Sequence, residues 1–445
     1  MGEGRAVFSG KLGFVLTAAG AAVGLGCLWR FPFIAPQNGG ILFVLLYIVL
    51  LLALGIPLLI TEMAIGRYAK CGILEAFTKL HPKFAFLGGL CLIAFGLIQP
   101  YYSILGGELS KYTFMYFSGQ SSALVQDGFF QSFISQTGEP ILWLGLFVGV
   151  TAIISFFGLN RGVERICKIL LPLEACLLVF LMIYCLTLPH ALEGLAYFFT
   201  PNFETFGANT ILAAMGQVFY SLSIGFGIML TFGSFVEKKI SLLSSAWTTA
   251  FFTLFIALIA SALIIPAGFI CTGGNPEILG SGTLFVSLPT VFNVMDFGWV
   301  VGAIFFLILT IATLTGNVTT LEVVVTALQD KFGMSRLWAV LIPTIFTFAA
   351  GVVISLGYGV LSWIHIGDLH LLEIVDRVLS DYLLPIVVLF ICVLVGYYIR
   401  KDIIAGEIGF AEGSAYAKVY LFMIRYFCPI CIILIFAANI LTKVL

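Results

Sequence analysis

Two stretches of the sequence decide the fold: residues 20–32, GAAVGLGCLWRFP, and residues 217–227, QVFYSLSIGFG. Each lies within a long apolar segment, and each holds a Gly-x-Gly motif near the middle of that segment, at Gly24–Gly26 and at Gly225–Gly227. Glycine is costly inside a helix because it frees the backbone to adopt other conformations. A single motif of this kind also serves close packing between membrane helices, but two motifs in matching positions predict two interrupted helices.

The composition places both stretches in a membrane protein. Of the 445 residues, 61% are hydrophobic and only 10% are charged, whereas soluble domains typically hold about 25% charged residues. Apolar runs of about 20 residues recur along the chain, and each can cross a hydrocarbon core of roughly 30 Å. Because lipid offers no partners to backbone polar groups, such runs must be helical. We therefore expect an all-α polytopic membrane protein in the lipid bilayer, and the net charge of −1 indicates no nucleic-acid partner.

Eleven membrane spans are predicted, within a single transmembrane domain of residues 1–445. Spans one and six contain the Gly-x-Gly motifs, so each motif interrupts the first helix of a five-span half. An odd repeat length gives the halves opposite orientations, which predicts a 5+5 inverted repeat, about 11–188 and 209–399, with an additional helix at about 418–442. The spans are expected at 11–35, 41–68, 84–117, 141–158, 166–188, 209–236, 243–271, 296–327, 336–357, 369–399 and 418–442.

The distribution of Lys and Arg predicts the orientation of these spans. The loops after spans two, four, six, eight and ten contain Lys or Arg, whereas the loops at 118–140, 189–208 and 272–295 contain neither. Because basic loops stay on the cytoplasmic side, we expect a multi-pass protein of the cell inner (plasma) membrane with a cytoplasmic N-terminus. We expect no cleaved signal, since the first apolar segment carries Arg30 and lacks a small-residue cleavage site.

Helix breaks at mid-membrane have a chemical consequence. They leave backbone N–H groups free on one side and carbonyl groups free on the other, and half-helix N-termini attract a carboxylate. The free carbonyls attract an ammonium group or a small cation. A zwitterionic amino acid matches both kinds of group, so the pattern predicts a secondary transporter whose site lies between the two broken helices.

Both stretches resemble signatures of the neurotransmitter:sodium symporter family, whose members have the LeuT fold. Asn38–Gly40 resembles the continuation of the first signature, Gly55–Pro57 and Glu62–Arg67 in span two are similar as well, and the resemblance runs from about residue 9 to about residue 400. It implies a LeuT fold with helices 1 and 6 unwound, in its bacterial eleven-span form. It further implies that the protein is a symporter that imports an amino acid by alternating access, and that it is not an enzyme.

The resemblance also implies a substrate site and an outer gate. Main-chain groups of helix 1 would hold the carboxylate and the amine, and side chains of spans three and six would form the pocket. That pocket is apolar and aromatic, so we expect a substrate with a neutral, hydrophobic or aromatic side chain. A transporter of amines that lack a carboxylate would need an acidic residue near position 24 to pair with the ammonium group. Gly24 stands there, which favours an amino acid. Thr320 is expected to add a polar contact. The substrate residues are Ala22, Leu25, Gly26, Ile98, Tyr102, Phe219, Tyr220, Ser221, Ser223 and Phe226, and the gate is Arg30 and Asp376, closing together with Phe219, with Gln217 beside them.

Sodium coupling is implied through two ion sites, and the sequence departs from the family pattern at the first. That site would use Ala22, Cys27, Ser221 and Thr253. A thiol at position 27 is a poor ligand for a hard cation that prefers oxygen, so we expect this site to be weak or absent. The second site keeps its oxygens and is expected to bind sodium, at Gly20, Val23, Ala312 and Thr315.

Chloride is not expected as a cofactor. Tyr47, Gln217 and Ser221 match the family's chloride ligands, but Ala257 stands where a hydroxyl or an acid would complete the site.

Two intramembrane acids, Glu108 and Glu174, have no counterpart in the family pattern. An acid within the membrane is a functional hypothesis by default. Lys111 lies one turn after Glu108 and is an available partner for it. Glu174 has no local partner, and we hypothesise that it takes up a proton that assists or replaces sodium. Proton-coupled transport and ion-independent exchange are therefore the alternatives to sodium symport, and the oligomeric state stays open.

Other classes of protein fit the sequence less well. An intramembrane enzyme would need clustered His, Asp or Cys, but the four histidines fall in predicted loops or at the edge of one, and no metal-ligand spacing occurs. A channel would need a ring of carbonyls or charges contributed by repeats or subunits, and the sequence contains no sign of one. A substrate sensor differs from a transporter in lacking saturable uptake.

Overall fold

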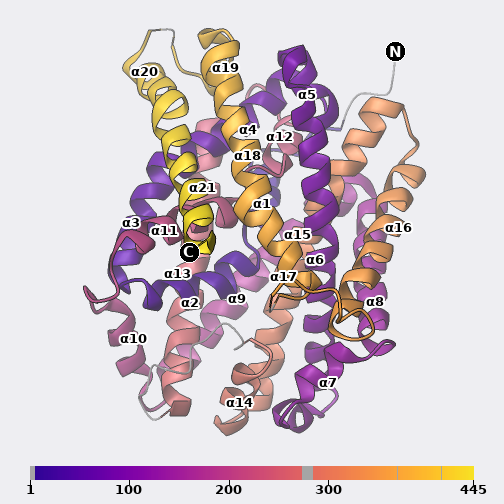
Figure 1. Ribbon diagram of the computed structural model, residues 1–445, viewed down its shortest axis with the longest axis vertical. Coiled ribbons are helices and arrows are strands. Elements are labelled where there is room, and N and C mark those ends of the chain that lie inside the picture. Colours follow the sequence, from indigo (N-terminus) through magenta and orange to yellow (C-terminus); the bar gives the residue numbers. More distant parts are fainter. Residues whose placement is uncertain (1–5, 273–283, 368, 412, 445) are drawn as a thin grey trace.

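The computed structural model describes residues 6–272, 284–367, 369–411 and 413–444, and their regular structure is helical (Figure 1). By length and composition, nine helices of the described residues can cross a membrane, and a bent pair, Lys11–Ala22 with Gly26–Gln37, is a tenth. The sixth predicted span is divided into two shorter helices, Ala208–Leu222 and Ile228–Gly233. Ten of the eleven predicted spans are thereby matched, with boundaries shifted by a few residues, and the sixth remains a prediction that coincides with these two helices.

The spans consist of α-helices that several π-helical or 3-10 turns (η) interrupt. In chain order they are α1 Lys11–Ala22, η1 Gly26–Arg30 and α2 Phe31–Gln37; α3 Ile41–Leu50, η2 Leu51–Gly55 and α4 Ile56–Ala69; η3 Pro82–Phe84 and α6 Phe86–Phe117; α8 Glu139–Phe156; η5 Leu159–Glu164 and α9 Arg165–Leu186; α11 Ala208–Leu222 and α12 Ile228–Gly233; α13 Leu242–Thr272; α15 Gly298–Phe332; α16 Arg336–Ser355 and η7 Leu356–Tyr358; α17 Leu371–Arg377, η8 Val378–Leu383, α18 Leu384–Val393 and η9 Leu394–Tyr398; α20 Ala415–Phe422, η10 Met423–Phe427 and α21 Cys428–Val444.

Short helices lie at both ends of this bundle. At the end that carries the N-terminus, α5 and α19 connect the spans, and at the opposite end lie α7, α10 and α14 (Figure 1). The bounds of the short helices are α5 Ile73–Leu80, η4 Ser121–Val125, α7 Phe129–Ser135, α10 Ala191–Phe199, α14 Ser287–Val294 and α19 Lys401–Ile408.

The first span breaks one residue earlier than its Gly-x-Gly motif. Helix α1 ends at Ala22, Val23 is extended (φ −80°, ψ 94°), and the chain turns by 59° before the helix resumes at Gly26. Gly26 therefore lies inside the resumed helix rather than in the break. A Cβ there would come within 2.5 Å of the Tyr220 ring, so the residue is needed for the close approach of the two broken helices.

The sixth span breaks across its predicted motif. Residues 223–227 are non-helical, and Ser223, Gly225 and Gly227 have positive φ values of 51°, 92° and 75°. Only glycine adopts this left-handed region without steric cost, so the two glycines explain the position of the break. Ser223 bears a side chain in the same region, and its hydroxyl donates a hydrogen bond to the Ala21 carbonyl, 2.7 Å away.

The two breaks lie at the centre of the bundle because of how the spans pack. Helix α1 packs against α9, α13 and α15, and the long helices α6 and α15 pack along one another. The end that carries the N-terminus is closed by buried or half-buried ion pairs. Arg67 Nε lies 3.0 Å from Glu407, and Arg336 Nη1 lies 2.8 Å from Glu322. Such charge-assisted bonds in a low-dielectric setting hold the helices in register at this end.

Candidate functional site

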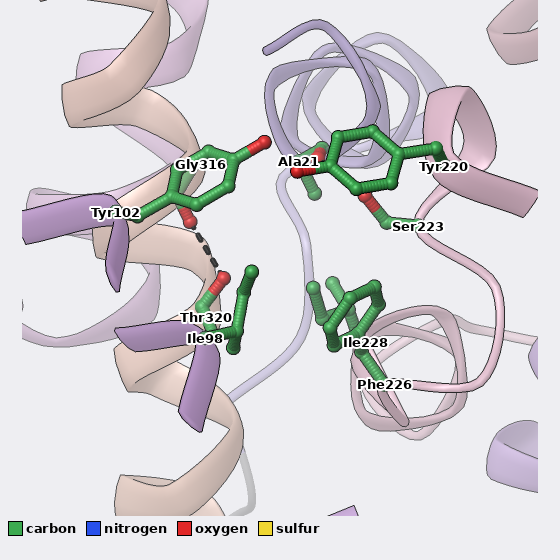
Figure 2. Close-up of a pocket in the computed structure, with 9 residues that line it drawn as sticks. All are labelled: Ala21, Ile98, Tyr102, Tyr220, Ser223, Phe226, Ile228, Gly316 and Thr320. Atoms are coloured by element: carbon green, nitrogen blue, oxygen red, sulfur yellow. Dashed lines mark hydrogen bonds between the residues drawn. The ribbon is translucent and has the colours of Figure 1, made fainter. Parts of the chain in front are cut away.

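A small cavity lies between the two broken helices. Its volume is about 20 Å³, which is room for about one water molecule. Side chains from spans three, six and eight surround it, together with the end of α1 (Figure 2). The lining residues are Ala21, Ile98, Tyr102, Tyr220, Ser223, Phe226, Ile228, Gly316 and Thr320. We call this the central cavity.

The central cavity has a polar end and an apolar end. In Figure 2 the rings of Tyr102 and Tyr220 point their hydroxyls toward each other beside Ala21, whereas Ile98, Phe226 and Ile228 lie on the other side. The arrangement offers hydroxyl groups near the helix breaks and hydrocarbon further away. It suits a ligand with a polar head and an apolar body.

Thr320 lines the central cavity, but its hydroxyl donates to the Gly316 carbonyl of its own helix at 2.8 Å (Figure 2). Gly316 itself leaves space, because a Cβ there would meet only the Tyr102 ring, at 3.6 Å.

Some backbone groups of the two breaks are bonded to side chains. Besides the bond from Ser223, Gln217 Nε2 donates to the Gly26 carbonyl at 2.7 Å, and the Gly225 N–H donates to Glu62 Oε1 at 2.7 Å. Glu62 is buried, and its second carboxylate oxygen has no partner among the described residues. The prediction of wholly free N–H and C=O groups is therefore too simple, since side chains tie the two broken helices together.

Half of the predicted substrate residues line the central cavity, and the other half lie elsewhere. Ile98, Tyr102, Tyr220, Ser223 and Phe226 line it, together with Thr320. Ala21, Ile228 and Gly316 line it too and were missed. Ile228 directly follows the second glycine motif, which is the signal that could have found it. The cavity lining does not include Ala22, Leu25, Gly26, Phe219 and Ser221.

Tyr220, and not Phe219, separates the central cavity from the space above it. Tyr220 lines the central cavity and a larger cavity of about 340 Å³, which we call the outer cavity. Phe219 lines a side cavity between α11 and α18, and Leu25 lines the outer cavity. Adjacent residues on a helix point about 100° apart, so an assignment one position away selects a different wall.

The predicted ion pair between Arg30 and Asp376 is not formed. Both residues line the outer cavity, but the Arg30 guanidinium lies over the Tyr220 ring, 4.8 Å from its centroid. Asp376 instead accepts a hydrogen bond from Ser380 Oγ at 3.3 Å. A cation over an aromatic face is attracted by the ring quadrupole, so Tyr220 competes with Asp376 for the arginine. Gln217, predicted beside this pair, is buried and bonded to Gly26.

The predicted ligands of the first sodium site are bonded to one another or to their own helices. The Cys27 thiol lies 3.6 Å from the Ala22 carbonyl. Ser221 Oγ lies 2.6 Å from Tyr47 Oη and donates to its own helix, and Thr253 Oγ1 donates to the Thr249 carbonyl at 2.9 Å. A hydroxyl that donates in this way keeps its oxygen lone pairs, so the weak point of the site is the thiol, a poor ligand for a hard cation. The expectation that the first site is weak or absent stays a prediction.

The residues of the second site fit a sodium ion better. No hydrogen bond within the described part of the chain is made to the carbonyl oxygen of Gly20 or of Val23, because α1 ends between them. Thr315 Oγ1 donates to the Ala312 carbonyl at 3.0 Å, which leaves the lone pairs of its oxygen free. Helix α15 packs against α1, so the free carbonyls and the hydroxyl come from neighbouring helices.

The chloride position is similarly engaged. Tyr47 and Ser221 bond each other through their hydroxyls at 2.6 Å, and Ala257 is fully buried. The expectation that chloride is not used stays a prediction.

Glu174 on α9 is fully buried, and neither of its carboxylate oxygens has a hydrogen-bond partner among the described residues. Its helix packs against α1, which places it near the first helix break. Helix α9 packs on α1, α13 and α15. The absence of a local partner agrees with the sequence prediction, and its role in proton uptake stays a hypothesis.

Comparison with known proteins identifies the class. A model of the sodium:neurotransmitter symporter family matches residues 5–124 and 113–444. The chain is 33% identical to an uncharacterized sodium-dependent transporter of Haemophilus influenzae, with 98% of each chain covered, and 30% identical to the uncharacterized sodium-dependent transporter YhdH of Bacillus subtilis, with 96% of each covered.

The fold is also that of a solved transporter. The crystal structure of MhsT in complex with L-phenylalanine superposes with a TM-score of 0.88, at 34% identity, covering 98% of this chain and 100% of MhsT. This chain therefore belongs to the sodium:neurotransmitter symporter family. It is a sodium-dependent symporter with the LeuT fold, and not an enzyme.

Proposed function

We propose that this protein imports a neutral amino acid with an aliphatic or aromatic side chain, coupled to sodium bound mainly at the second site. The central cavity carries the proposal, because its hydroxyl groups lie beside the helix breaks and its far wall is Ile98, Phe226 and Ile228. A zwitterionic head would meet the polar end, and a side chain without charge would meet the apolar wall. The similar protein MhsT was solved with L-phenylalanine, which supports the same class of substrate.

The small volume of the central cavity bears on how a substrate would enter. About 20 Å³ does not hold an amino acid, so the walls must separate. Tyr220 lies between the central and outer cavities and under the Arg30 guanidinium. Movement of Tyr220 with Arg30 would join the two cavities, and pairing of Arg30 with Asp376 would then close the outer side. These three residues are our proposed gate for alternating access.

We propose that the protein lies in the plasma membrane with its N-terminus on the cytoplasmic side. The loops rich in Lys and Arg and the ion pairs of Arg67 and Arg336 lie at the end that carries the N-terminus. The outer cavity and the helices α7, α10 and α14 would then face the outside.

Uptake into proteoliposomes tests the proposal. Radiolabelled phenylalanine, tryptophan, leucine, valine, glutamate and lysine are offered with a sodium gradient, with a proton gradient, or with choline replacing sodium. We expect saturable, sodium-driven uptake of one or more of the four neutral amino acids. Uptake confined to lysine or glutamate would contradict the proposed substrate class. Equal uptake in choline would contradict the proposed coupling and favour ion-independent exchange, and uptake driven by protons alone would favour the proton-coupled alternative.

A matched pair of variants tests the site itself. Phe226→Ala removes part of the apolar wall and should raise the KM for a large substrate at least about fivefold, since burying such a ring contributes roughly 1.5–3 kcal/mol. Phe219→Ala makes the same change on the same broken helix, but outside the central cavity. Its KM should stay close to that of the wild type.

A further inference from the structure

A second cavity adjoins the outer cavity and is lined by acids. It has a volume of about 450 Å³ and shares Trp29, Tyr101 and Asp376 with the outer cavity. Glu108 from α6 and Glu373 from α17 also line it. We call it the acidic cavity. Its described lining contains three carboxyl groups and no Lys, Arg or His side chain.

Two of these acids, Glu108 and Glu373, line the cavity without a basic side chain in its described lining. Glu108 is 95% buried, and it makes no hydrogen bond and no ion pair in the described part of the structure, since the nearby Lys111 pairs with Glu139. Glu373 Oε1 accepts a hydrogen bond from the Tyr358 hydroxyl at 2.5 Å, whereas its Oε2 is buried without a described partner. Both carboxyl groups line the same cavity. Two like charges in a partly dehydrated cavity repel, so a cation between them would be strongly favoured.

The nearby basic groups are used elsewhere. Lys111, the partner available to Glu108 by sequence spacing, pairs instead with Glu139 of α8. Arg30 lines the outer cavity but lies over the Tyr220 ring. The His370 ring packs on Tyr358 at 5.2 Å, and His370 does not line the acidic cavity. Residues 273–283 contain no Lys, Arg or His, so this segment brings no further positive charge.

We propose that Glu108 and Glu373 form a third cation site, which holds a sodium ion on its way from the outside to the second sodium site. Two carboxylates supply the oxygen ligands that a hard cation prefers, and the net negative charge of the joined cavities raises the local concentration of cations. The proposal goes beyond the proposed function, since it rests on the sodium dependence of the family and not on which amino acid is carried.

The geometry favours a loosely held monovalent ion over a chelated divalent one. No group of three or more His, Cys, Asp or Glu side chains among the described residues is arranged to hold a metal ion. A divalent ion such as calcium takes six to eight oxygen ligands, which two carboxylates in a wet cavity do not supply. A sodium ion that keeps part of its hydration shell needs fewer protein ligands, and weak binding lets it move on.

Sodium binding to purified variants tests the third site. Binding of ²²Na⁺ is measured over a concentration series for the wild type, Glu108→Gln, Glu373→Gln and the double variant. We expect the wild type to bind a low-affinity sodium ion that all three variants lack, while the tighter sodium is retained. The double variant should lose no more than either single variant, because the two acids act as one site. Wild-type binding curves in Glu108→Gln would overturn the proposal.

Glu193→Gln is the matched control. It removes an acid at the same end of the bundle, on α10, whose side chain is exposed and contacts only His190 among the described partners. This variant should bind sodium as the wild type does. Loss of the low-affinity ion in Glu193→Gln as well would overturn the proposal, because it would mean that surface charge in general holds the ion.

Uptake supplies the second readout. We expect Glu108→Gln to raise the half-saturating sodium concentration for uptake severalfold, with the maximal rate at saturating sodium unchanged. The rise should shrink when choline chloride is added, because salt screens a purely electrostatic attraction. If Glu108→Gln instead raises the KM for the amino acid at saturating sodium and leaves the sodium dependence unchanged, the acids bind the ammonium group of the substrate and the sodium proposal is wrong. The binding experiment needs no substrate, so it stands even if the proposed amino-acid class fails.

Discussion

The two predicted sodium sites both take ligands from the first broken helix, and they differ in how their oxygen atoms are used. At the first site the predicted ligands bond to one another and to their own helices: Cys27 to Ala22, Ser221 to Tyr47, and Thr253 to Thr249. At the second site the carbonyls of Gly20 and Val23 accept no described hydrogen bond. Since Thr315 likewise bonds to Ala312, the difference lies in the main chain. The break in helix 1 leaves two carbonyl oxygens free for the second site, whereas the first site depends on position 27, where the side chain is a thiol and a poor ligand for a hard cation.

The largest effect should follow from a change at the second site. Thr315→Val removes a hydroxyl oxygen with little change in shape, and losing an interaction with a charged group costs about 2 kcal/mol. The half-saturating sodium concentration should therefore rise roughly thirtyfold. Uptake measured against sodium concentration in proteoliposomes checks this. Thr313→Val is the matched control, since Thr313 is a buried threonine of the same helix whose hydroxyl bonds only to Leu309; an equal rise in this variant would show that the helix, and not the site, is affected.

A change at the first site should affect stability rather than sodium. Ser221→Ala leaves the buried Tyr47 hydroxyl without its partner, which costs about 1–3 kcal/mol. The unfolding temperature in detergent should fall, and the sodium dependence of uptake should not change. Tyr47→Phe combined with Ser221→Ala should cost less than the sum of the two single changes, because both remove the same bond. A strong shift in sodium dependence would instead restore a role for Ser221 as an ion ligand.

Glu174→Gln tests whether a proton takes the place of the missing first cation. Glu174 is buried without a described hydrogen-bond partner, and α13, which packs against its helix, contains no Asp, Glu, Lys, Arg or His within 242–272. If Glu174 takes up a proton during transport, wild-type uptake depends on external pH and the uptake of the glutamine variant does not. Uptake rates over a pH series at constant sodium provide the measurement. A variant with the pH dependence of the wild type would end the hypothesis.

The smallest effect is expected from Cys27→Ala. The thiol is buried and bonds weakly to the Ala22 carbonyl, so its removal leaves a small cavity without removing a sodium ligand. The half-saturating sodium concentration should stay within about twofold of the wild type. A small truncation of this kind lowers the free energy of unfolding by only about a few tenths to one kcal/mol, and it removes no sodium ligand. A tenfold rise would show that the thiol takes part in ion binding after all.

The local sequence was enough to predict the membrane spans and the second helix break. Runs of apolar residues give the spans without knowledge of their neighbours, because lipid forces every such run to be a helix. The glycines at 225 and 227 place the second break correctly, since only glycine adopts positive φ without steric cost. The family signature at residues 20–32 and 217–227 was confirmed by the family model and by the MhsT structure.

Side-chain partners were harder to predict, because they depend on the rotation and depth of helices far apart in the sequence. Phe219 and Tyr220 are adjacent and both line the side cavity, yet only Tyr220 also lines the central and outer cavities. Lys111 lies one turn from Glu108 but reaches Glu139, and Arg30 lies over Tyr220 rather than beside Asp376. Lys111 and Arg30 each had two candidate partners, and the sequence does not show which of the two lies closer in the folded protein.

The sequence by itself therefore determined that the chain spans a membrane with two interrupted helices in an inverted repeat, because composition and glycine placement act locally. Only the tertiary structure decided which groups at the breaks stay free and which are bonded, as Gly225 is to Glu62 and Ser223 is to Ala21. It also brought Glu108 and Glu373, 265 positions apart in the sequence, to one cavity. The physical reason is that a buried polar group takes whichever partner the packing of distant helices brings within hydrogen-bond distance.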